Sequence, residues 1–351
     1  MTREGKRLIW CKRASLAAAA VALACAPDPV GVQPTTSASR QISAADAAAS
    51  WSGASLIQLV PPGAGPNFNT QYLDGCPAAS RDGKTFFMAT NRPDSHGIMH
   101  GIDIYVSHRE STNAPWSDPV RVPEPINSES NDFCPMLAGD GHEFFFASNR
   151  PGGCGGDDIY VTRFRDDGTI ETPKNLGCDV NSAGNEAGPV PLTEPGRGKV
   201  LYFSSTRLGG FAPDPQGATQ GDADVYSSEW RGGRYRPRAL VAGVNSDRDD
   251  MQPYIQGDAL ELYFSSARPG GLGGPDIWVA TRASAHDAWS APVNLGPNVN
   301  SGSGESRPSL SGDGRTLYFG STKSTAMPGQ TPTTDSNIYA SSRDQAPRPR
   351  A

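Results

Sequence analysis

Apolar and polar residues alternate over residues 262–305 in short runs that predict three β-strands. Leu262–Ser266 is apolar and aromatic, and it ends at a Gly/Pro-rich loop over residues 268–275. Asp276–Thr281 alternates polar and apolar residues, and a third run covers Trp289–Leu295 before a loop of Asn, Ser and Gly. The same module recurs along most of the chain.

Five copies of this module are marked by a carboxylate that stands three residues before a proline. Successive carboxylates are 58, 54, 64 and 55 residues apart. Each copy continues with a turn, an aromatic strand, a basic residue, and an Asp or Asn that opens another strand. The carboxylates are Asp74, Asp132, Glu186, Asp250 and Glu305, and the basic residues are Arg92, Arg150, Arg207, Arg268 and Lys323. A repeat of this length, with several strands in each unit, predicts the blades of a β-propeller.

The fifth copy has no outer strand of its own after about Ser342. The segment that precedes the first copy, residues 51–60, has none of the other strands of a blade and matches residues 115–120. Pairing these two ends would close the ring and leave no open sheet edge. The sequence therefore predicts an all-β fold, a five-bladed β-propeller of four-stranded antiparallel blades whose last blade is completed by residues 51–60.

Three motifs carry a family resemblance: Ser148–Gly153, Gly155–Tyr160 and Trp289–Gly296. They resemble the PD40 repeat, the WD40-like propeller motif that is also found in TolB-like domains and in some OmpA-family envelope proteins. The resemblance covers residues 51–343 and implies the propeller fold. It implies no particular activity, because propeller repeats host unrelated functions.

The amino-terminal residues predict export. A basic start is followed by a short run of small apolar residues at Ala14–Ala24, which indicates a signal peptide over residues 1–24. The following Cys25 predicts a lipoprotein that is lipidated at this residue, although an ordinary signal peptidase site after Ala24 is the alternative. Residues 25–50 predict a disordered tether, and residues 344–351 a disordered tail. We expect a cell-envelope protein, held by a lipid anchor and facing the periplasm or the cell surface.

Charge and motif content exclude several functions. Removal of residues 1–24 removes five basic residues and one acidic residue from totals of 31 and 37, which leaves 26 basic and 36 acidic residues and a formal charge of −10. This charge argues against nucleic acid or an anionic membrane surface as the main partner. The chain contains no GxGxxG after a strand, no GxxxxGK[ST] and no HExxH, so no cofactor is expected.

Four cysteines lie in the predicted propeller, and export into an oxidising compartment favours disulfides. Cys76 and Cys134 occupy the same position in neighbouring repeats, where inner strands approach each other. Cys154 and Cys178 lie in connections that emerge on one face. Of the three possible connectivities, we expect Cys76 with Cys134 and Cys154 with Cys178.

The repeated carboxylates are the candidate chemistry. Together with Arg92, Arg150, Arg207 and Arg268, they are candidate binding residues at one mouth of the central channel. Five-bladed glycosidases use inner-strand acids for hydrolysis, which is the enzymatic alternative. Groups repeated in every blade are more typical of ion pairs that fix loops, each expected to include the Asp of the same repeat, as with Arg150 and Asp158. No catalytic residue is assigned, because hydrolysis requires two acids in different environments.

Single loops supply the remaining candidates. His96 and His100 near Asp94 are a possible metal pair without a third ligand, so no metal is assigned. Phe211 and Trp230 are aromatic candidates for a ligand surface, and Asp157, Asp222 and Asp258 offer oxygen atoms to calcium. We therefore expect a non-catalytic propeller that binds a protein, peptide or glycan, with a glycan hydrolase as the alternative.

Overall fold

The fold is described here from a computed structural model of the 351-residue chain. The structure describes residues 42–57, 67–94, 96–324 and 336–344. The chain divides into two units, Met1–Ser39 and Arg40–Ala351, and all described residues belong to the second. The predicted signal peptide, the lipidation site Cys25, most of the tether, residues 58–60 of the closing strand and most of the tail lie outside the described residues.

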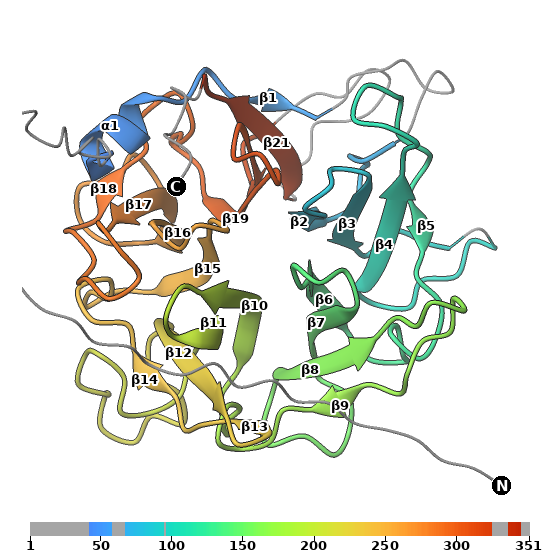
Figure 1. Ribbon diagram of the computed structural model, residues 1–351, viewed down its shortest axis with the longest axis horizontal. Helices are drawn as coiled ribbons and strands as arrows, with labels where there is room; N and C mark the ends of the chain where they lie inside the picture. The colour runs from blue at the N-terminus through green and yellow to red at the C-terminus, as the bar shows by residue number, and fades with distance from the viewer. Residues whose placement is uncertain (1–41, 58–66, 95, 325–335, 345–351) are drawn as a thin grey trace, which may run out of the picture. The chain divides into compact units, whose positions relative to one another are not determined.

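Five antiparallel sheets stand around a common centre as the blades of a propeller (Figure 1), which confirms the predicted fold. Each sheet runs from an inner strand beside the centre to a two-residue outer strand. From inner to outer, the blades are β2 (Asp74–Ala79), β3 (Thr85–Thr90), β4 (Asp103–His108) and β5 (Val120–Arg121); β6 (Asp132–Leu137), β7 (Glu143–Ser148), β8 (Asp158–Arg163) and β9 (Lys174–Asn175); β10 (Glu186–Glu194), β11 (Gly198–Ser205), β12 (Asp224–Arg231) and β14 (Ala239–Leu240); β15 (Asp250–Ile255), β16 (Glu261–Ser266), β17 (Asp276–Thr281) and β18 (Val293–Asn294); and β19 (Glu305–Leu310), β20 (Thr316–Ser321), β21 (Asn337–Ser342) and β1 (Ser55–Leu56).

The strands follow the hydrophobic pattern closely. The predicted strands 262–266 and 276–281 correspond to β16 and β17, whereas only Val293–Asn294 of the predicted run 289–295 is paired. The third blade carries an additional strand, β13 (Arg234–Tyr235), which pairs with the end of β12 beyond the usual blade. A Gly232–Gly233 turn, with both residues at positive φ, makes this tight hairpin possible.

The amino-terminal strand closes the ring as predicted. Ser55 pairs with Ala340 and Leu56 pairs with Tyr339, so β1 is the outer strand of the blade that contains β21. The backbone N–H of Ser52 also donates to Ser342 O at 2.8 Å. The first and last strands of the propeller therefore belong to one sheet.

A short helix, α1 (Ala44–Ala49), precedes this strand. The hydroxyl of Ser43 caps it by accepting from Asp46 N at 3.1 Å. Its buried alanines pack against β17 and β18. Residues 44–49 are thus helical, where the sequence predicted no regular structure, because small apolar side chains on one side of the segment are enough to cover the edge of a blade.

The aromatic second strand of each blade supplies most of the core. Its side chains reach into both neighbouring interfaces, as when Phe144 of β7 lies 4.9 Å from Phe87 of β3, measured between ring centroids. The largest fully buried side chains include Phe86, Phe145, Phe203, Phe264 and Phe319 from these strands. Burial of large aromatic rings between blades holds the ring together.

The third residue of every inner strand is left-handed, and a proline follows it. The register of each inner pair shifts at this point, which is the mark of a β-bulge. The left-handed residues are Cys76, Cys134, Gly188, Gln252 and Arg307, with φ between 47° and 61°. These bulges turn the third residues and the prolines toward one cavity at the middle of the channel, which we call the waist.

Both predicted disulfides are present. Cys76 is bonded to Cys134 across the waist, and Cys154 is bonded to Cys178 within the second blade. The first joins the inner strands of two blades, whereas the second ties a loop to a connection on the same blade. Disulfides are typical of exported proteins.

Removal of either disulfide is expected to destabilise the propeller. Removal of Cys76–Cys134 should lower the free energy of unfolding more than removal of Cys154–Cys178. The closed segments span 58 and 24 residues, which in the chain-entropy model correspond to about 4 and about 3 kcal/mol. Urea unfolding of the C76A/C134A and C154A/C178A variants measures both values. A larger loss for the C154A/C178A variant would contradict this order.

Candidate functional site

The five repeated carboxylates open the five inner strands, at one end of the channel. Their residues are 0–1% exposed, so none of them presents its side chain to solvent. The residues are Asp74 in β2, Asp132 in β6, Glu186 in β10, Asp250 in β15 and Glu305 in β19.

The fourth blade shows how such a carboxylate is held. Arg268 Nη2 donates to Asp250 Oδ1 at 2.5 Å, while the backbone N–H and the hydroxyl of Ser246 donate to Oδ2 at 2.5 and 2.8 Å. Arg268 also donates to Ser266 Oγ and to Val244 O, at 2.8 and 2.6 Å. Both oxygens of the buried acid are thus engaged, and one guanidinium ties the inner strand to the two loops beside it.

The other blades repeat this carboxylate clasp. In the first blade, Arg92 Nη2 lies 2.6 Å from the carboxylate of Asp74. The second blade has Arg150 Nη2 at 2.7 Å from Asp132, and the third has Arg207 Nη2 at 3.1 Å from Glu186. In the fifth blade Lys323 replaces the arginine. Glu305 there accepts from the hydroxyls of Ser301 and Ser321 at 2.6 and 2.7 Å and from Ser301 N at 2.8 Å.

The aspartate at the start of the third strand of a blade was expected to join the carboxylate clasp. In the second blade this residue, Asp158, does not join it. Arg150 pairs with Asp132 and not with Asp158. The latter instead accepts from Cys154 N at 2.6 Å and from Asn175 Nδ2 at 3.1 Å. Asp158 therefore orders the loop before its own strand, while the arginine reaches the inner strand.

Burial sets the electrostatics of these acids. Burial raises the pKa of Asp74, and the charge of Arg92 opposes this rise. Burial also raises the pKa of Glu186 against hydrogen bonds from Ser182 and Ser205. In the same region, burial and the charge of Asp250 act against a backbone hydrogen bond from Phe211 and raise the pKa of Asp224 to about 6.

A hydrolase would require two of these acids to be accessible to a substrate. Each of the five repeated acids is instead buried and engaged by an arginine, hydroxyl or backbone N–H group. A ligand would have to displace these bonds to reach them. Their role as ligand-binding residues stays a prediction.

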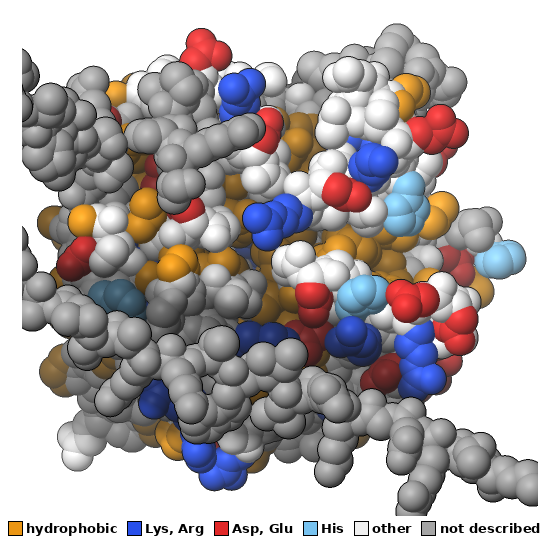
Figure 2. Space-filling view, in the orientation of Figure 1, with side chains coloured by type: hydrophobic (Ala, Val, Ile, Leu, Met, Phe, Trp, Pro, Cys, Tyr) orange, Lys and Arg blue, Asp and Glu red, His pale blue; other side chains and the backbone are white. Residues whose placement is uncertain are grey.

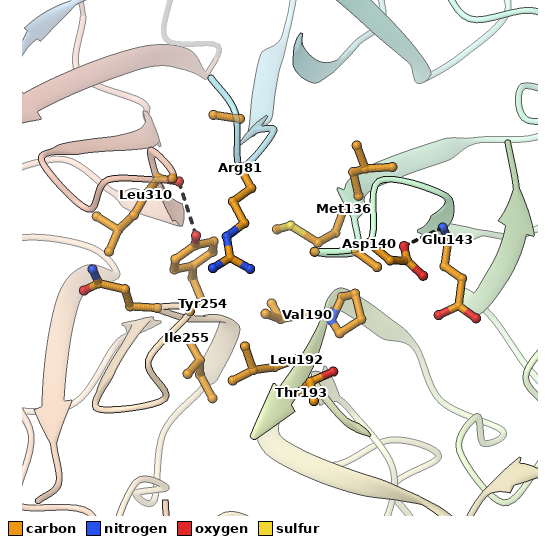
Figure 3. Close-up of a pocket in the computed structure, with 18 of the residues that line it drawn as sticks. Arg81, Met136, Asp140, Glu143, Val190, Leu192, Thr193, Tyr254, Ile255 and Leu310 are labelled. Atoms are coloured by element: carbon orange, nitrogen blue, oxygen red, sulfur yellow. Dashed lines mark hydrogen bonds between the residues drawn. The ribbon is translucent and has the colours of Figure 1, made fainter. Parts of the chain in front are cut away.

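The open cavity lies at the other end of the inner strands, where the sequence predicted no site. It has a volume of about 600 Å³ and is lined by the carboxyl ends of inner strands and by the hairpin turns that follow them. We call it the funnel (Figure 3). Its apolar wall is formed by Met136, Leu137, Val190, Leu192, Tyr254, Ile255 and Leu310. Figure 2 shows hydrophobic side chains gathered toward the middle of the ring in the same orientation as Figure 1.

Three of the charged groups of the funnel wall, Lys199, Glu143 and Asp140, are engaged with one another or with backbone. Lys199 Nζ lies 2.9 Å from Glu143 Oε2. Burial acts against ionisation of Asp140, but backbone hydrogen bonds from His142 and Glu143 outweigh it and lower the pKa of this acid. Asp140 is therefore charged near neutral pH, which does not suit a proton donor for hydrolysis, and Glu143 is paired with Lys199.

Arg81 is different, because its side chain makes no hydrogen bond or ion pair within the described part of the chain. It is exposed and stands on the turn between β2 and β3. Figure 3 shows its guanidinium over the funnel, beside Tyr254. The funnel thus combines an apolar wall with one cation that is available to a ligand.

The histidine and aromatic candidates that the sequence placed in single loops do not line the funnel. His100 Nε2 lies 3.2 Å from Asp94 Oδ2, and His96 Nδ1 lies 3.7 Å from the same oxygen. Phe211 and Trp230 are 55% and 42% exposed, and Trp230 packs edge-on against Tyr235. Within the described residues, no group of three or more His, Cys, Asp or Glu side chains is arranged to hold a metal ion, and no helix is long and apolar enough to cross a membrane.

Comparisons with known proteins find similar folds among solved structures but no matching family. No protein-family model matches the chain, and no curated protein matches it. Among solved structures, a glycoside hydrolase is similar at 10% identity over 86% of this chain and 94% of its own, with a TM-score of 0.50. An endo-arabinase from Bacteroides thetaiotaomicron matches at 13% identity over 81% and 97%, with a TM-score of 0.49. TolB from Acinetobacter baumannii matches at 14% identity over 78% and 54%, with a TM-score of 0.39. The likeness to the glycoside hydrolase, at 10% identity, concerns the fold alone and says nothing about activity.

Proposed function

We propose that this propeller is a non-catalytic binding module of the cell envelope, which takes a peptide segment of a partner protein into the funnel. One observation carries the proposal: the repeated acids are sealed in clasps, while the open cavity has an apolar wall and an unpaired arginine. A volume of about 600 Å³ lies within the usual range of roughly 300–1,000 Å³ for ligand pockets. Apolar walls with one cation suit a peptide segment better than a sugar chain.

The setting of this module is part of the proposal. The export signal, lipidation of Cys25 and the relation to PD40 repeats come from sequence patterns. Two disulfides support residence in an oxidising compartment. A lipid anchor followed by a tether would hold the funnel near a membrane while leaving it free to meet an envelope protein.

Reversal of one funnel charge tests the site. The Arg81→Glu variant should lose at least about 1.4 kcal/mol of binding free energy, which is a tenfold loss of affinity. Lys84→Glu is the matched control, because it makes the same charge change three residues away, at an exposed position outside the funnel wall. The measurement is quantitative mass spectrometry of proteins captured from detergent-solubilised envelopes by the wild type and each variant.

A partner of the funnel is enriched by the wild type and by Lys84→Glu, and it is depleted in Arg81→Glu and in Leu192→Glu. Equal enrichment by all four proteins would place binding elsewhere. The hydrolase alternative is tested with a panel of polysaccharides. Turnover by the wild type that disappears in folded Asp250→Ala protein would overturn the non-catalytic function.

A further inference from the structure

The waist of the channel holds one charged residue. Arg307 is the third residue of β19, and its four counterparts in the other inner strands are Cys76, Cys134, Gly188 and Gln252. The two cysteines are bonded to each other, so they contribute no charge. Among the described residues, Arg307 is therefore the only charged one in the wall of the waist cavity, and its counterparts from the other four blades are neutral.

Other arginines of the described residues that are buried or half-buried all have partners. Arg307 does not: its Nε is fully buried without a hydrogen bond, and its guanidinium makes no ion pair or hydrogen bond within the described residues. Eight others bind carboxylates, and two donate to backbone carbonyls. The eight are Arg92, Arg121, Arg150, Arg197, Arg207, Arg268, Arg282 and Arg343, and the two are Arg109 and Arg238.

The acids closest along the two strands do not compensate this charge. Asp74 is engaged by Arg92 and Thr70, and Glu305 by Ser301 and Ser321. Burial alone accounts for the lowered pKa of Arg307. A desolvated guanidinium without a counter-charge is unfavourable, which makes the position attractive to an anion.

The space beside Arg307 limits the size of that anion. The waist cavity has a volume of about 30 Å³, and a water molecule needs roughly 10–15 Å³ of such volume. Two small polar atoms fit, whereas a phosphate group or a sugar ring does not. Met136 and Val190 line both this cavity and the funnel, so the two spaces adjoin.

Two further polar groups without partners in the described part of the chain lie in this region, one beside the Arg307 guanidinium at Gly75 and one in the cavity wall. Arg307 Nη1 and Ser336 Oγ lie 3.1 and 3.6 Å from the point where a Cβ on Gly75 would stand, and Ser336 Oγ is buried without a hydrogen bond. The buried side-chain oxygen of Gln252, in the wall of the same cavity, also has no partner. Rotation of this amide places an N–H donor at that position.

We propose that the waist is a binding site for a carboxylate group, with Arg307 as the residue that recognises it. A planar guanidinium matches the two oxygens of a carboxylate. Ser336 and the rotated amide of Gln252 supply further donors. The carboxylate comes from a small free acid or from an acidic residue of a peptide that enters through the funnel.

Thermal unfolding of the full propeller tests this site independently of any partner, with sodium acetate, chloride and phosphate compared at equal ionic strength. Acetate at about ten times its Kd should raise the Tm of the wild type by roughly 2–4 °C, and phosphate should raise it less. Arg307→Met should lose the response to acetate, and its Tm without acetate should equal or exceed that of the wild type. Arg307→Lys keeps the charge without the fork and should retain part of the response. Arg315→Met, an exposed control, should respond like the wild type.

A response of Arg307→Met equal to that of the wild type would overturn the site, and so would an effect of phosphate or chloride as large as that of acetate. A capped Leu-Asp-Leu peptide and its Asn counterpart then distinguish the two sources. Stabilisation by the Asp peptide beyond acetate, and its absence with the Asn peptide, assigns the site to a peptide side chain. Equal effects of acetate and the Asp peptide assign it to a free acid. Loss of peptide capture in Arg81→Glu without any change in the acetate response would separate the funnel from the waist.

Discussion

The Asp250→Ala variant is expected to unfold with a free energy about 3–5 kcal/mol below that of the wild type. The substitution leaves the guanidinium of Arg268, whose side chain is 11% exposed, without its counter-charge. It also leaves the N–H and hydroxyl of Ser246 without their acceptor. One substitution thus breaks the clasp between an inner strand and the loops on either side of it.

Urea unfolding gives this value, and Asp247→Ala is the matched control. Asp247 lies three residues earlier in the same loop but is exposed, so its substitution should change stability by no more than about 0.5 kcal/mol. A double variant, Asp250→Leu with Arg268→Met, removes both charges and should recover much of the loss. If Asp250→Ala remained within about 1 kcal/mol of the wild type, the clasp would not be a main source of stability.

The second large effect is expected at the closure of the ring, where Trp51→Ala should cost about 3–5 kcal/mol. Trp51 is 2% exposed and lies edge-on to Tyr263 of the neighbouring blade, with ring centroids 6.1 Å apart. The guanidinium carbon of Arg343 lies 4.6 Å from the Trp51 ring centroid. Loss of the indole removes the packing that holds the amino-terminal segment to the last blade.

Hydrogen exchange locates the damage in this variant. Amides of β21 should lose protection in Trp51→Ala, because their outer partner β1 is released, while amides of β8 should keep theirs. Trp230→Ala removes an indole that is 42% exposed and is the control for the loss of a tryptophan as such. Equal loss of protection in β8 and β21 would indicate global destabilisation and contradict a local role in closure.

The repeat made the fold predictable, because three of the five blades share the stacking of an arginine on the tryptophan of the outer segment. Arg109 lies over Trp116, and Arg282 lies over Trp289, as Arg343 lies over Trp51. The resemblance of residues 51–60 to residues 115–120 therefore reported a real outer strand. The cysteine pairs were predictable for the same reason, since equal positions in adjacent repeats bring Cys76 and Cys134 together.

The funnel was not predictable in this way. Its wall combines the ends of inner strands with turns from different blades, and the side chains there differ from repeat to repeat. Arg81 has no counterpart that marks it in the repeat, and its lack of a partner depends on what surrounds it in space. From the sequence, the repeated acids predicted a site at the other end of the channel, where these acids are buried.

The position of Arg307 could have been noticed in the sequence. It is the residue before the repeated proline, where the other copies have Cys, Cys, Gly and Gln. A charged residue at that position departs from the pattern. Its meaning depends on the left-handed bulge, which turns the third residue toward the channel, and the spacing of the motif alone does not show that bulge.

The pairing of β1 with β21 also dictates an order of assembly. Ser55 and Ala340 are partners although most of the chain lies between them. Bringing them together has a high entropic cost of loop closure, so their contact is favoured only after the intervening blades have formed. The ring consequently has a seam, which is formed by the first and last strands of the propeller. Local opening of this protein should begin at that seam and leave four intact blades, of which the first two stay joined by the Cys76–Cys134 disulfide.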